Sequence, residues 1–589
     1  MNSTEPLEAV RWDLADLIEG AATETLLERA LERAGAFAER YRGTLETIDG
    51  AGLAEAMHEL AAIYDLVGRA DSYASLDFST DTTDPARGAL LARVQERSTV
   101  LATRLLFFEL EWAALSDDRA EELLGHDGLD FCRHHLRTAR RYRPHLLSEP
   151  EEQIFTEKSI SGANAWARLF GELTSAIEVQ LEETVTLDVA LARLTSPSRE
   201  VRREGAAAVT RALEPGLRTR AFIFNTLLVD KATDDRLRAY GNWLAARNLA
   251  NEASDESVAA LVAAVVNRYE LARRWYRLKA ELLGIDRLAD YDRMAPLAAD
   301  EEHVAWQAAQ ELVLDAYSSF SPKLGALAER FFVERWIDAP PGHGKRGGAF
   351  CAYTVPSVHP YVLLNFTGRR RDVLILAHEL GHGVHAALAA EQGIFHQGTP
   401  LTLAETASVF GEALTFGRLL DASPTPAARL ALLAEDVEGA IATVFRQVAM
   451  NRFEQLVHTE RREVGELAVE RFGELWAQTQ TELLGDAVEV TDDYRCWWSY
   501  IPHFINTPGY VYAYSYGQLL ALSVYDRYLT EGSGFEARYV ELLASGGSRS
   551  PEELGEIVGI DLRDPGFWER GLDLVERRLE AAEAAAREV

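Results

Sequence analysis

Two histidines and a glutamate, His378, Glu379 and His382, stand together in the segment LAHELGHGVH at residues 376–385. On an α-helix, side chains four residues apart lie one above the other, so the two imidazoles can share a metal ion. Glu379 follows the first imidazole, where a carboxylate can take a proton from the water used in hydrolysis. Apolar residues without a proline surround the motif from 372 to 390. This context favours a metal site over two core histidines, which would need buried polar partners, and the spacing therefore predicts zinc-dependent hydrolysis.

A catalytic zinc ion usually has three protein ligands and a water molecule. The third histidine of a metzincin would be residue 388, which is Leu388 in this chain, so that class is excluded. The downstream carboxylates are Glu391, Glu405 and Glu412. Glu391 lies near the end of the same predicted helix and cannot easily fold back to the metal. Glu405 and Glu412 lie two turns apart on one face of the next helical pattern, residues 403–420, so either could be the third ligand.

Glu405 also has a structural alternative. Thr402 and Glu405 match a capping box, in which the glutamate bonds back to the start of its own helix, and the residues alone give ligand and cap equal weight. Glu412 would then be the substitute ligand, or a carboxylate that orients one of the histidines. We expect His385, one turn beyond His382, to support a ligand or to face the substrate rather than to bind the metal, with a packed histidine as the alternative.

The segment HFINTPGYVYAYSYG at residues 503–517 places four tyrosines at alternate positions. The leucine-rich sequence that follows favours a helix beginning near residue 508 over a strand. On a helix, Tyr510 and Tyr514 share one face, and Tyr512 and Tyr516 share another. A phenol is a neutral donor at pH 7 and can stabilise the oxyanion that forms when a carbonyl is attacked. Aromatic packing with locally bonded hydroxyls is the competing interpretation, and from the residues alone it is the commoner one.

The composition indicates a mostly helical protein. The chain has 589 residues, of which 47% are hydrophobic, and Ala, Leu, Glu and Arg dominate. That length predicts two to four structural units. The formal net charge of -33 argues against a nucleic-acid surface and against anionic membranes, because both need a basic footprint.

The cysteines and the N-terminal sequence indicate the cellular compartment. The three cysteines are far apart and form no C-x-x-C pair, so neither a disulfide framework nor a cysteine zinc site is expected. The N-terminus lacks the basic and apolar stretches of a signal peptide, and no uninterrupted apolar run approaches the ~18 residues of a membrane helix. We expect a soluble cytoplasmic protein with no membrane or nucleic-acid partner.

The pattern along the chain places a loose domain boundary near residue 195. It predicts a helix over residues 199–213 and one long helix over 255–283, with Ser254 as its N-cap. Two short strand-like pieces, 349–355 and 361–366, come just before the metal-binding helix. The edge of such a sheet could pair with an extended peptide, and a small hairpin that only supports the helix is an equally good interpretation.

Five segments carry a family resemblance: HELGHGVH at 378–385, ETAS at 405–408, His503 with the tyrosines after Gly509, RPHLLSEPEE at 143–152, and the glycine-rich GKRGGAF at 344–350. Together they resemble the thimet-oligopeptidase family of zinc metallopeptidases, and most closely its bacterial oligoendopeptidase F branch. They extend over most of the chain, so the combination is far more specific than the first motif alone.

The resemblance implies a mostly α fold: a two-lobed helical ellipsoid with a deep substrate channel and zinc at its floor. The small predicted β-sheet would lie next to the zinc-binding helix. Residues 1–195 would form a helical region that includes an oligoendopeptidase F-like N-terminal domain, and residues 196–589 the zinc peptidase domain. The resemblance also implies Glu405 as the third zinc ligand. It implies His503, Tyr510 and Tyr514 as transition-state donors, with Tyr512 able to replace either tyrosine.

The sequence thus predicts an endopeptidase with one Zn²⁺ per chain that hydrolyses internal bonds of oligopeptides. In this hypothesis His378, His382 and Glu405 bind zinc, and Glu379 is the general base. One alternative is a zinc carboxypeptidase or dipeptidyl carboxypeptidase on the same kind of scaffold. Another is a non-catalytic peptide-binding protein with structural zinc. The oligomeric state stays open.

Overall fold

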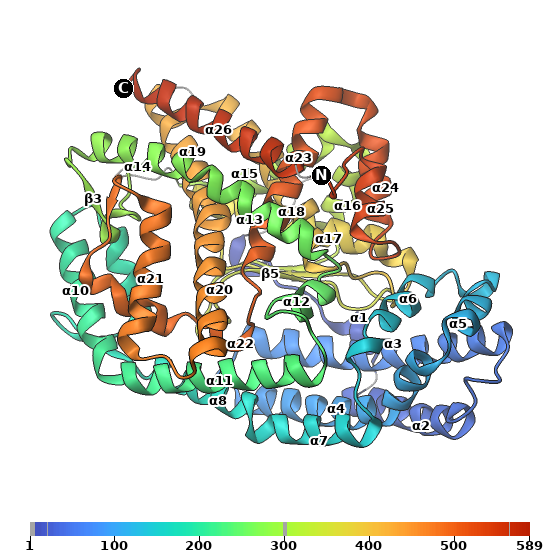
Figure 1. Cartoon of the computed structure of the whole chain (residues 1–589). Helices are drawn as coiled ribbons and strands as arrows, with labels where there is room; N and C mark the ends of the chain where they lie inside the picture. Colours follow the sequence, from blue (N-terminus) through green and yellow to red (C-terminus); the bar gives the residue numbers. More distant parts are fainter. Residues whose placement is uncertain (1–5, 21, 298–302, 424, 565) are drawn as a thin grey trace. The chain divides into compact units, whose positions relative to one another are not determined.

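The computed structural model of the chain describes residues 6–20, 22–297, 303–423, 425–564 and 566–589. The chain is mostly helical with three small sheets (Figure 1), as the sequence predicts. It packs as two compact units of three segments each. Unit 1 comprises Met1–Leu146, Glu301–Asp421 and Val524–Leu562, and unit 2 comprises Leu147–Asp300, Ala422–Ser523 and Arg563–Val589.

The helices and strands of unit 1 are α1 (Ala15–Ile18), α2 (Thr23–Tyr41), α3 (Gly50–Thr80), α4 (Pro85–Ala114), α5 (Asp117–Leu124), α6 (Arg133–Arg141), α15 (Trp306–Phe320), α16 (Pro322–Val333), β4 (Ile337–Asp338), β5 (Phe350–Ala352), β6 (Tyr361–Leu363), α17 (Arg370–Ala389), α18 (Leu401–Ala422), α24 (Glu536–Ala544) and α25 (Pro551–Ile557).

Those of unit 2 are α7 (Glu149–Ser161), α8 (Ala163–Ser175), β1 (Glu178–Gln180), β2 (Thr184–Thr186), α9 (Leu187–Ala192), α10 (Arg199–Leu213), α11 (Leu217–Leu237), α12 (Ala245–Ala250), α13 (Asp255–Asn267), α14 (Tyr269–Leu283), β3 (Leu288–Ala289), α19 (Pro426–Ala440), α20 (Arg446–Val464), α21 (Val469–Leu484), β7 (Val488–Glu489), α22 (His503–Asn506) and α26 (Phe567–Ala586). Helix α23 (Tyr512–Glu531) begins in unit 2 and ends in unit 1.

Local signals explain several of these boundaries. Helix α10 has the bounds that the sequence predicts, and the Ser198 side chain caps its first turn. Ser254 caps α13 as expected, but the predicted single helix over 255–283 is wrong. The backbone leaves helical geometry at Arg268 (φ -104°, ψ 16°), so two helices, α13 and α14, replace it. The predicted division at residue 195 stays a prediction, as does the channel between two lobes.

The small sheet beside α17 is confirmed. Its strand order is β4-β6-β5, with β4 parallel and β5 antiparallel to the central strand β6. All three residues of β6 are buried, whereas β5 is half-buried and forms an edge of the sheet. Helix α17 packs against both β5 and β6, so the predicted metal-binding motif lies directly against this edge strand.

Helix α17 is a core helix. The Asp372 side chain accepts hydrogen bonds from the backbone N–H groups of Thr367 and Arg369 and so holds the start of the helix. Among the described residues, one stretch, Arg370–Gln392, is long and apolar enough to cross a membrane by length and composition. However, 61% of its apolar window is buried inside the protein, and polar residues of the metal motif interrupt it.

Helices α17 and α18 approach each other at two glycines. A Cβ on Gly381 of α17 would collide with the backbone at Ala407 of α18. A Cβ on Gly411 of α18 would collide with the hydroxyl of Tyr317 and would lie 3.1 Å from the carbonyl oxygen of Ala377. The Tyr317 hydroxyl donates to that carbonyl at 2.7 Å. The two helices therefore pack backbone to backbone, which side chains at these positions would prevent.

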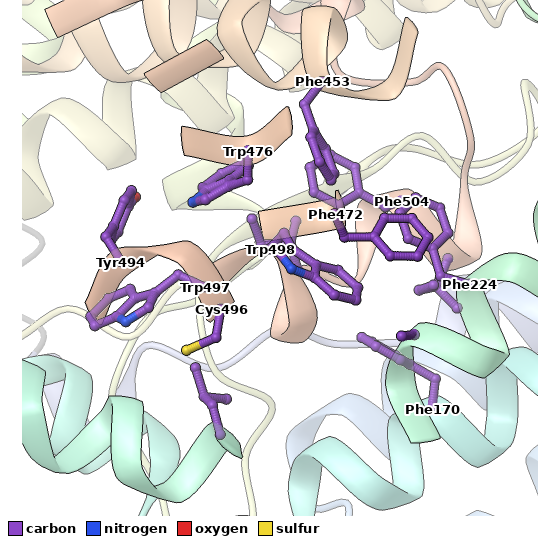
Figure 2. Close-up of a cluster of buried hydrophobic side chains, with 14 of the residues drawn as sticks. Phe170, Phe224, Phe453, Phe472, Trp476, Tyr494, Cys496, Trp497, Trp498 and Phe504 are labelled. Carbon is purple, nitrogen blue, oxygen red and sulfur yellow. The ribbon is translucent and has the colours of Figure 1, made fainter. Parts of the chain in front are cut away.

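The core of unit 2 is an aromatic cluster that brings together α11, α20, α21 and α22, and Figure 2 shows its side chains converging. Phe224 stacks on Phe472 with ring centroids 5.2 Å apart, and Phe472 stacks on Trp498 at 4.7 Å. The ring centroids of Phe453 on α20 and Phe504 on α22 are 5.1 Å apart. Burying this much aromatic surface fixes α22, and with it His503, the first residue of that helix.

Gly411→Ala should destabilise the protein by about 1–3 kcal/mol, because the new methyl group overpacks the contact between α17 and α18. The matched control is Gly439→Ala on α19, where a Cβ meets nothing within 4 Å. An exposed helical Gly→Ala change is expected to be neutral or to stabilise by up to about 1 kcal/mol. Thermal unfolding of both variants measures the difference, and equal melting temperatures would contradict the close packing.

Candidate metal centre

The first turns of α18 and the middle of α17 bring His378, His382 and Glu405 together. One ligand atom from each residue can be chosen so that all lie within 4.8 Å of one another. The Oε2 atom of Glu405 lies 3.4 Å from Nε2 of His378 and 3.6 Å from Nε2 of His382. Within the described part of the chain, this is the single group of three or more such residues found close enough to hold a metal ion.

The direction of the Glu405 side chain is that of a ligand rather than of a cap. Helix α18 begins at Leu401, so Thr402 already lies inside it, and a capping box would need the helix to begin after Thr402. The hydroxyl of Ser408 donates to Glu405 Oε2 at 2.7 Å. This bond holds the carboxylate on the side of the helix that faces the two imidazoles.

Glu412 supports the centre from two turns further along α18. Its Oε2 atom lies 3.2 Å from Nδ1 of His378. A carboxylate on Nδ1 fixes the tautomer that leaves Nε2 as the donor to a metal, and it also fixes the ring angle. The structure therefore separates the two candidates on α18: Glu405 reaches the Nε2 atoms, and Glu412 reaches the far side of one ring.

The charges of the centre are strongly coupled. Burial lowers the pKa of His378, but the hydrogen bond to Glu412 and the negative charge of Glu405 outweigh burial and raise that pKa to about 9. Burial lowers the pKa of His382 to about 4. Burial opposes ionisation of Glu405, yet the two histidines hold its pKa below the usual value. A divalent cation would take the place of the proton on His378.

The donor set fits zinc. It consists of two imidazole nitrogens and one carboxylate oxygen, with a further carboxylate behind one imidazole. Two histidines and a glutamate would supply three protein ligands and leave room for water, which is the ligand pattern of catalytic rather than structural zinc sites.

The side chain of Glu379 extends from α17 toward the edge strand β5. It is 8% exposed, and the backbone N–H of Cys351 on β5 donates to its carboxylate. Burial raises the pKa of Glu379 to about 7, although the neighbouring His378 opposes the rise. A carboxyl group that titrates near neutral pH is suited to accept a proton and return it.

The other residues singled out near the motif lie outside the ligand group. His385 is 3% exposed, and burial lowers its pKa to about 3, so it packs as a neutral imidazole. Glu391 follows the end of α17 and takes no part in the group. Tyr353, just after β5, was not expected from the sequence. Its ring lies 6.4 Å from those of both His382 and His385, and its buried hydroxyl has no hydrogen-bond partner among the described residues.

His503, Tyr510 and Tyr514 form a second group, in unit 2. The ring of His503 stacks on Tyr510 at 5.9 Å and lies edge-on to Tyr514 at 6.0 Å. Nε2 of His503 lies 3.4 Å from the Tyr514 hydroxyl, and the two tyrosine rings are 5.0 Å apart. Tyr510 and Tyr514 lie side by side as predicted, but the predicted helix start near residue 508 is wrong, because α23 begins at Tyr512 and Tyr510 precedes it.

Tyr512 belongs to the opposite face of α23, with Tyr516. Its ring is fully buried, and its hydroxyl accepts a hydrogen bond from Asn251 at 2.9 Å. A phenol with this burial and partner is part of the packing. Of the three tyrosines that the sequence left open, Tyr510 and Tyr514 are the two whose rings gather with His503.

The raised pKa of His378 predicts a pH-dependent metal affinity. His378 must lose its proton to bind zinc, so below about pH 9 the zinc dissociation constant should fall about tenfold for each unit that the pH rises. Glu412→Gln keeps an oxygen acceptor for Nδ1 but removes the charge that raises the pKa of His378. The zinc dissociation constant of this variant should therefore stop changing at a lower pH than that of the wild type. Competition with a chelator of known pH dependence measures both proteins, and identical profiles would contradict the role given to Glu412.

Comparison with known proteins finds peptidases. Residues 192–574 match Peptidase family M3, and residues 111–178 match the family described as Oligopeptidase F. Oligopeptidase PepF of Bacillus subtilis is 26% identical over 557 residues, which cover 92% of this chain and 82% of that protein. An Oligoendopeptidase F homolog of Lactococcus lactis is 25% identical and covers 99% of this chain and 98% of its own length.

The fold has solved counterparts. The crystal structure of oligoendopeptidase-F from Enterococcus faecium superposes with a TM-score of 0.74 at 23% identity, covering 96% of this chain and 100% of that chain. The family match extends over well more than half of the sequence and contains both the metal group and the His503 group. The chain therefore belongs to peptidase family M3.

Proposed function

We propose that this chain is a zinc-dependent endopeptidase that hydrolyses internal peptide bonds of short oligopeptides. Membership of family M3 makes it a metallo-oligopeptidase, and the family implies a metal. The observation that supports zinc-dependent hydrolysis is the close approach of His378, His382 and Glu405, with Glu379 beside them. We propose that each chain binds one zinc ion through His378, His382 and Glu405.

The residues divide the work of hydrolysis. Bound zinc would supply a Lewis acid that polarises the scissile carbonyl and makes water more acidic. Glu379 accepts the proton of the attacking water and hands it to the leaving amine, which its pKa near 7 permits in both directions. The N–H of Cys351 keeps the Glu379 carboxylate in place during this exchange. We assign His503, Tyr510 and Tyr514 to stabilising the oxyanion.

Substrate binding can use the sheet next to the metal helix. β5 is an edge strand, and an extended peptide can add to such an edge through main-chain hydrogen bonds. This binding mode depends little on side chains, so it suits oligopeptides of varied sequence.

The proposal extends to organisation and location. Residues 1–195 would be an oligoendopeptidase F-like N-terminal region and residues 196–589 the catalytic domain, supported by family matches at 111–178 and 192–574. We place the enzyme in the cytoplasm, with oligopeptides as partners and neither nucleic acid nor membrane, supported by the net charge of -33.

A peptide blocked at both ends should be cut internally, and the cutting should stop when a chelator removes the metal. Glu379→Gln should keep its zinc and lose about 10²- to 10⁴-fold in kcat, the usual contribution of a general base. Mass spectrometry of the products and metal analysis of both proteins give the result. Cuts confined to peptides with a free C-terminus would instead indicate a carboxypeptidase, and zinc binding without any turnover would indicate a peptide-binding protein.

Tyr514→Phe should lower kcat by about 10²-fold with little change in KM, because its hydroxyl would act only in the transition state. Tyr512→Phe is the matched control: it removes a hydroxyl from the same helix, but one bonded to Asn251. Steady-state kinetics of the two variants decide the assignment. A larger loss of kcat for Tyr512→Phe would assign the oxyanion role to the Tyr512 hydroxyl instead.

A further inference from the structure

A tight turn sets the start of α23 and therefore the position of its tyrosines. The backbone N–H of Tyr510 donates to the carbonyl of Thr507 at 3.1 Å, which closes a β-turn with Pro508 and Gly509 at its centre. Gly509 has φ +74°. Proline followed by glycine with positive φ is the pattern of a type II turn. The N–H of Ala513 then donates to the carbonyl of Tyr510 at 3.0 Å, so the turn leads directly into the helix.

Both polar groups of the central peptide of this turn are bonded to side chains of unit 2, one of them fully buried and the other partly buried. The N–H of Gly509 donates to Oε1 of Glu454 at 2.8 Å, and the carbonyl of Pro508 accepts from Nε of Arg247 at 3.5 Å. Glu454 lies on α20 and Arg247 on α12, both marked in Figure 1. Because the N–H and C=O of one peptide point in opposite directions, the two side chains hold the peptide from both sides.

This arrangement selects one of two turn types. Types I and II differ mainly by a flip of the central peptide. A flipped peptide would turn the Gly509 N–H toward Arg247, donor against donor, and the Pro508 carbonyl toward Glu454, acceptor against acceptor. Unpaired polar groups in a buried site are costly. A Cβ at Gly509 would also lie 2.6 Å from Cδ1 of Leu244, so the turn fits tightly against the segment before α12.

Glu454 is an unusual core residue. Its side chain is fully buried, and its second oxygen, Oε2, has no hydrogen-bond partner among the described residues. One helical turn further along α20, His458 is buried and stacks on Trp243 with ring centroids 4.6 Å apart. Burial raises the pKa of Glu454 to about 8, although the Gly509 N–H and Arg247 favour the carboxylate. A carboxyl group that is fully buried, with one oxygen unpartnered among the described residues, points to a role beyond packing.

We propose that Glu454 is a positioning residue of the peptidase reaction: together with Arg247 it fixes the Pro508–Gly509 peptide and thereby the directions of the Tyr510 and Tyr514 hydroxyls. Glu454 itself does not touch the substrate. The inference rests on the proposed function, in which these hydroxyls stabilise the oxyanion. Small errors in the place of such donors cost much of the rate.

Three variants test the role of Glu454 in the full-length, zinc-loaded enzyme. Glu454→Met removes the acceptor at similar length and should lower kcat on the order of tenfold or more, with KM and zinc content unchanged. Glu454→Gln keeps an oxygen for the Gly509 N–H and should restore most of kcat. Arg247→Met removes the bond to the Pro508 carbonyl on the other side of the same peptide and should also lower kcat. It tests the same role if Glu454→Met folds poorly.

The stability control is Val457→Ala, on the same helix and buried in the apolar cluster of unit 2. It should lower the melting temperature while leaving kcat per folded molecule as in the wild type. If Glu454→Met loses no more kcat than Val457→Ala, or if Glu454→Gln is as slow as Glu454→Met, the positioning role is wrong.

A double-mutant cycle separates this inference from the function on which it rests. If Glu454 acts through Tyr514, then Glu454→Met combined with Tyr514→Phe should be little slower than Tyr514→Phe alone. Fully additive losses would overturn the inference. If Tyr514→Phe and Tyr510→Phe are both as fast as the wild type, the proposed oxyanion role fails first. If they are slow and Glu454→Met is normal, only the positioning role fails.

Discussion

The metal centre depends on the backbone contact between α17 and α18. Packed helices normally keep their axes 8–10 Å apart, and the glycines at 381 and 411 allow the two backbones to touch. At that separation a glutamate side chain is long enough to reach imidazoles on the neighbouring helix. Because Glu405 and Glu412 lie two turns apart on one face, a single helix supplies both the carboxylate at the Nε2 atoms and the carboxylate behind His378. The Tyr317 hydroxyl, bonded to the carbonyl of Ala377, strengthens the same contact.

Strand β5 is the second element on which the chemistry depends. Its Cys351 N–H donates to Glu379, so this edge of the sheet holds the proposed base, and under the proposed function the same strand would also pair with an extended peptide. Such a shared edge would align a bound peptide with the carboxylate that must take and return the proton. A helix supplies imidazoles at a fixed spacing, but its main-chain groups are bonded within the helix, whereas an edge strand can offer main-chain groups to another chain.

Local patterns in the sequence predicted what is local in the structure. The spacing of His378 and His382 predicted the helix and its ligand face, and the two short strand-like pieces before it predicted two strands of the sheet. Helical period predicted the pairing of Tyr510 with Tyr514, although Tyr510 lies in the turn just before α23. Helix crossings are not local, so the residues by themselves could not choose between ligand and cap for Glu405. Nor did periodicity show the break at Arg268, because the apolar pattern continues across it.

Two fully buried carboxyl groups of unit 2, Asp292 and Glu454, differ in their hydrogen-bond partners, and the difference supports the role of Glu454. Asp292 is also fully buried, but it accepts hydrogen bonds from Arg199, Arg202 and the backbone of Ala289. A carboxylate satisfied in this way serves the fold, because its partners offset the desolvation of the charge. Glu454 has one main-chain donor, and its second oxygen has no partner among the residues that the structure describes. Replacing it with an apolar residue would relieve that desolvation, so stability alone does not account for its presence. What an apolar residue could not do is hold the Gly509 N–H, and with it one conformation of the turn that begins α23.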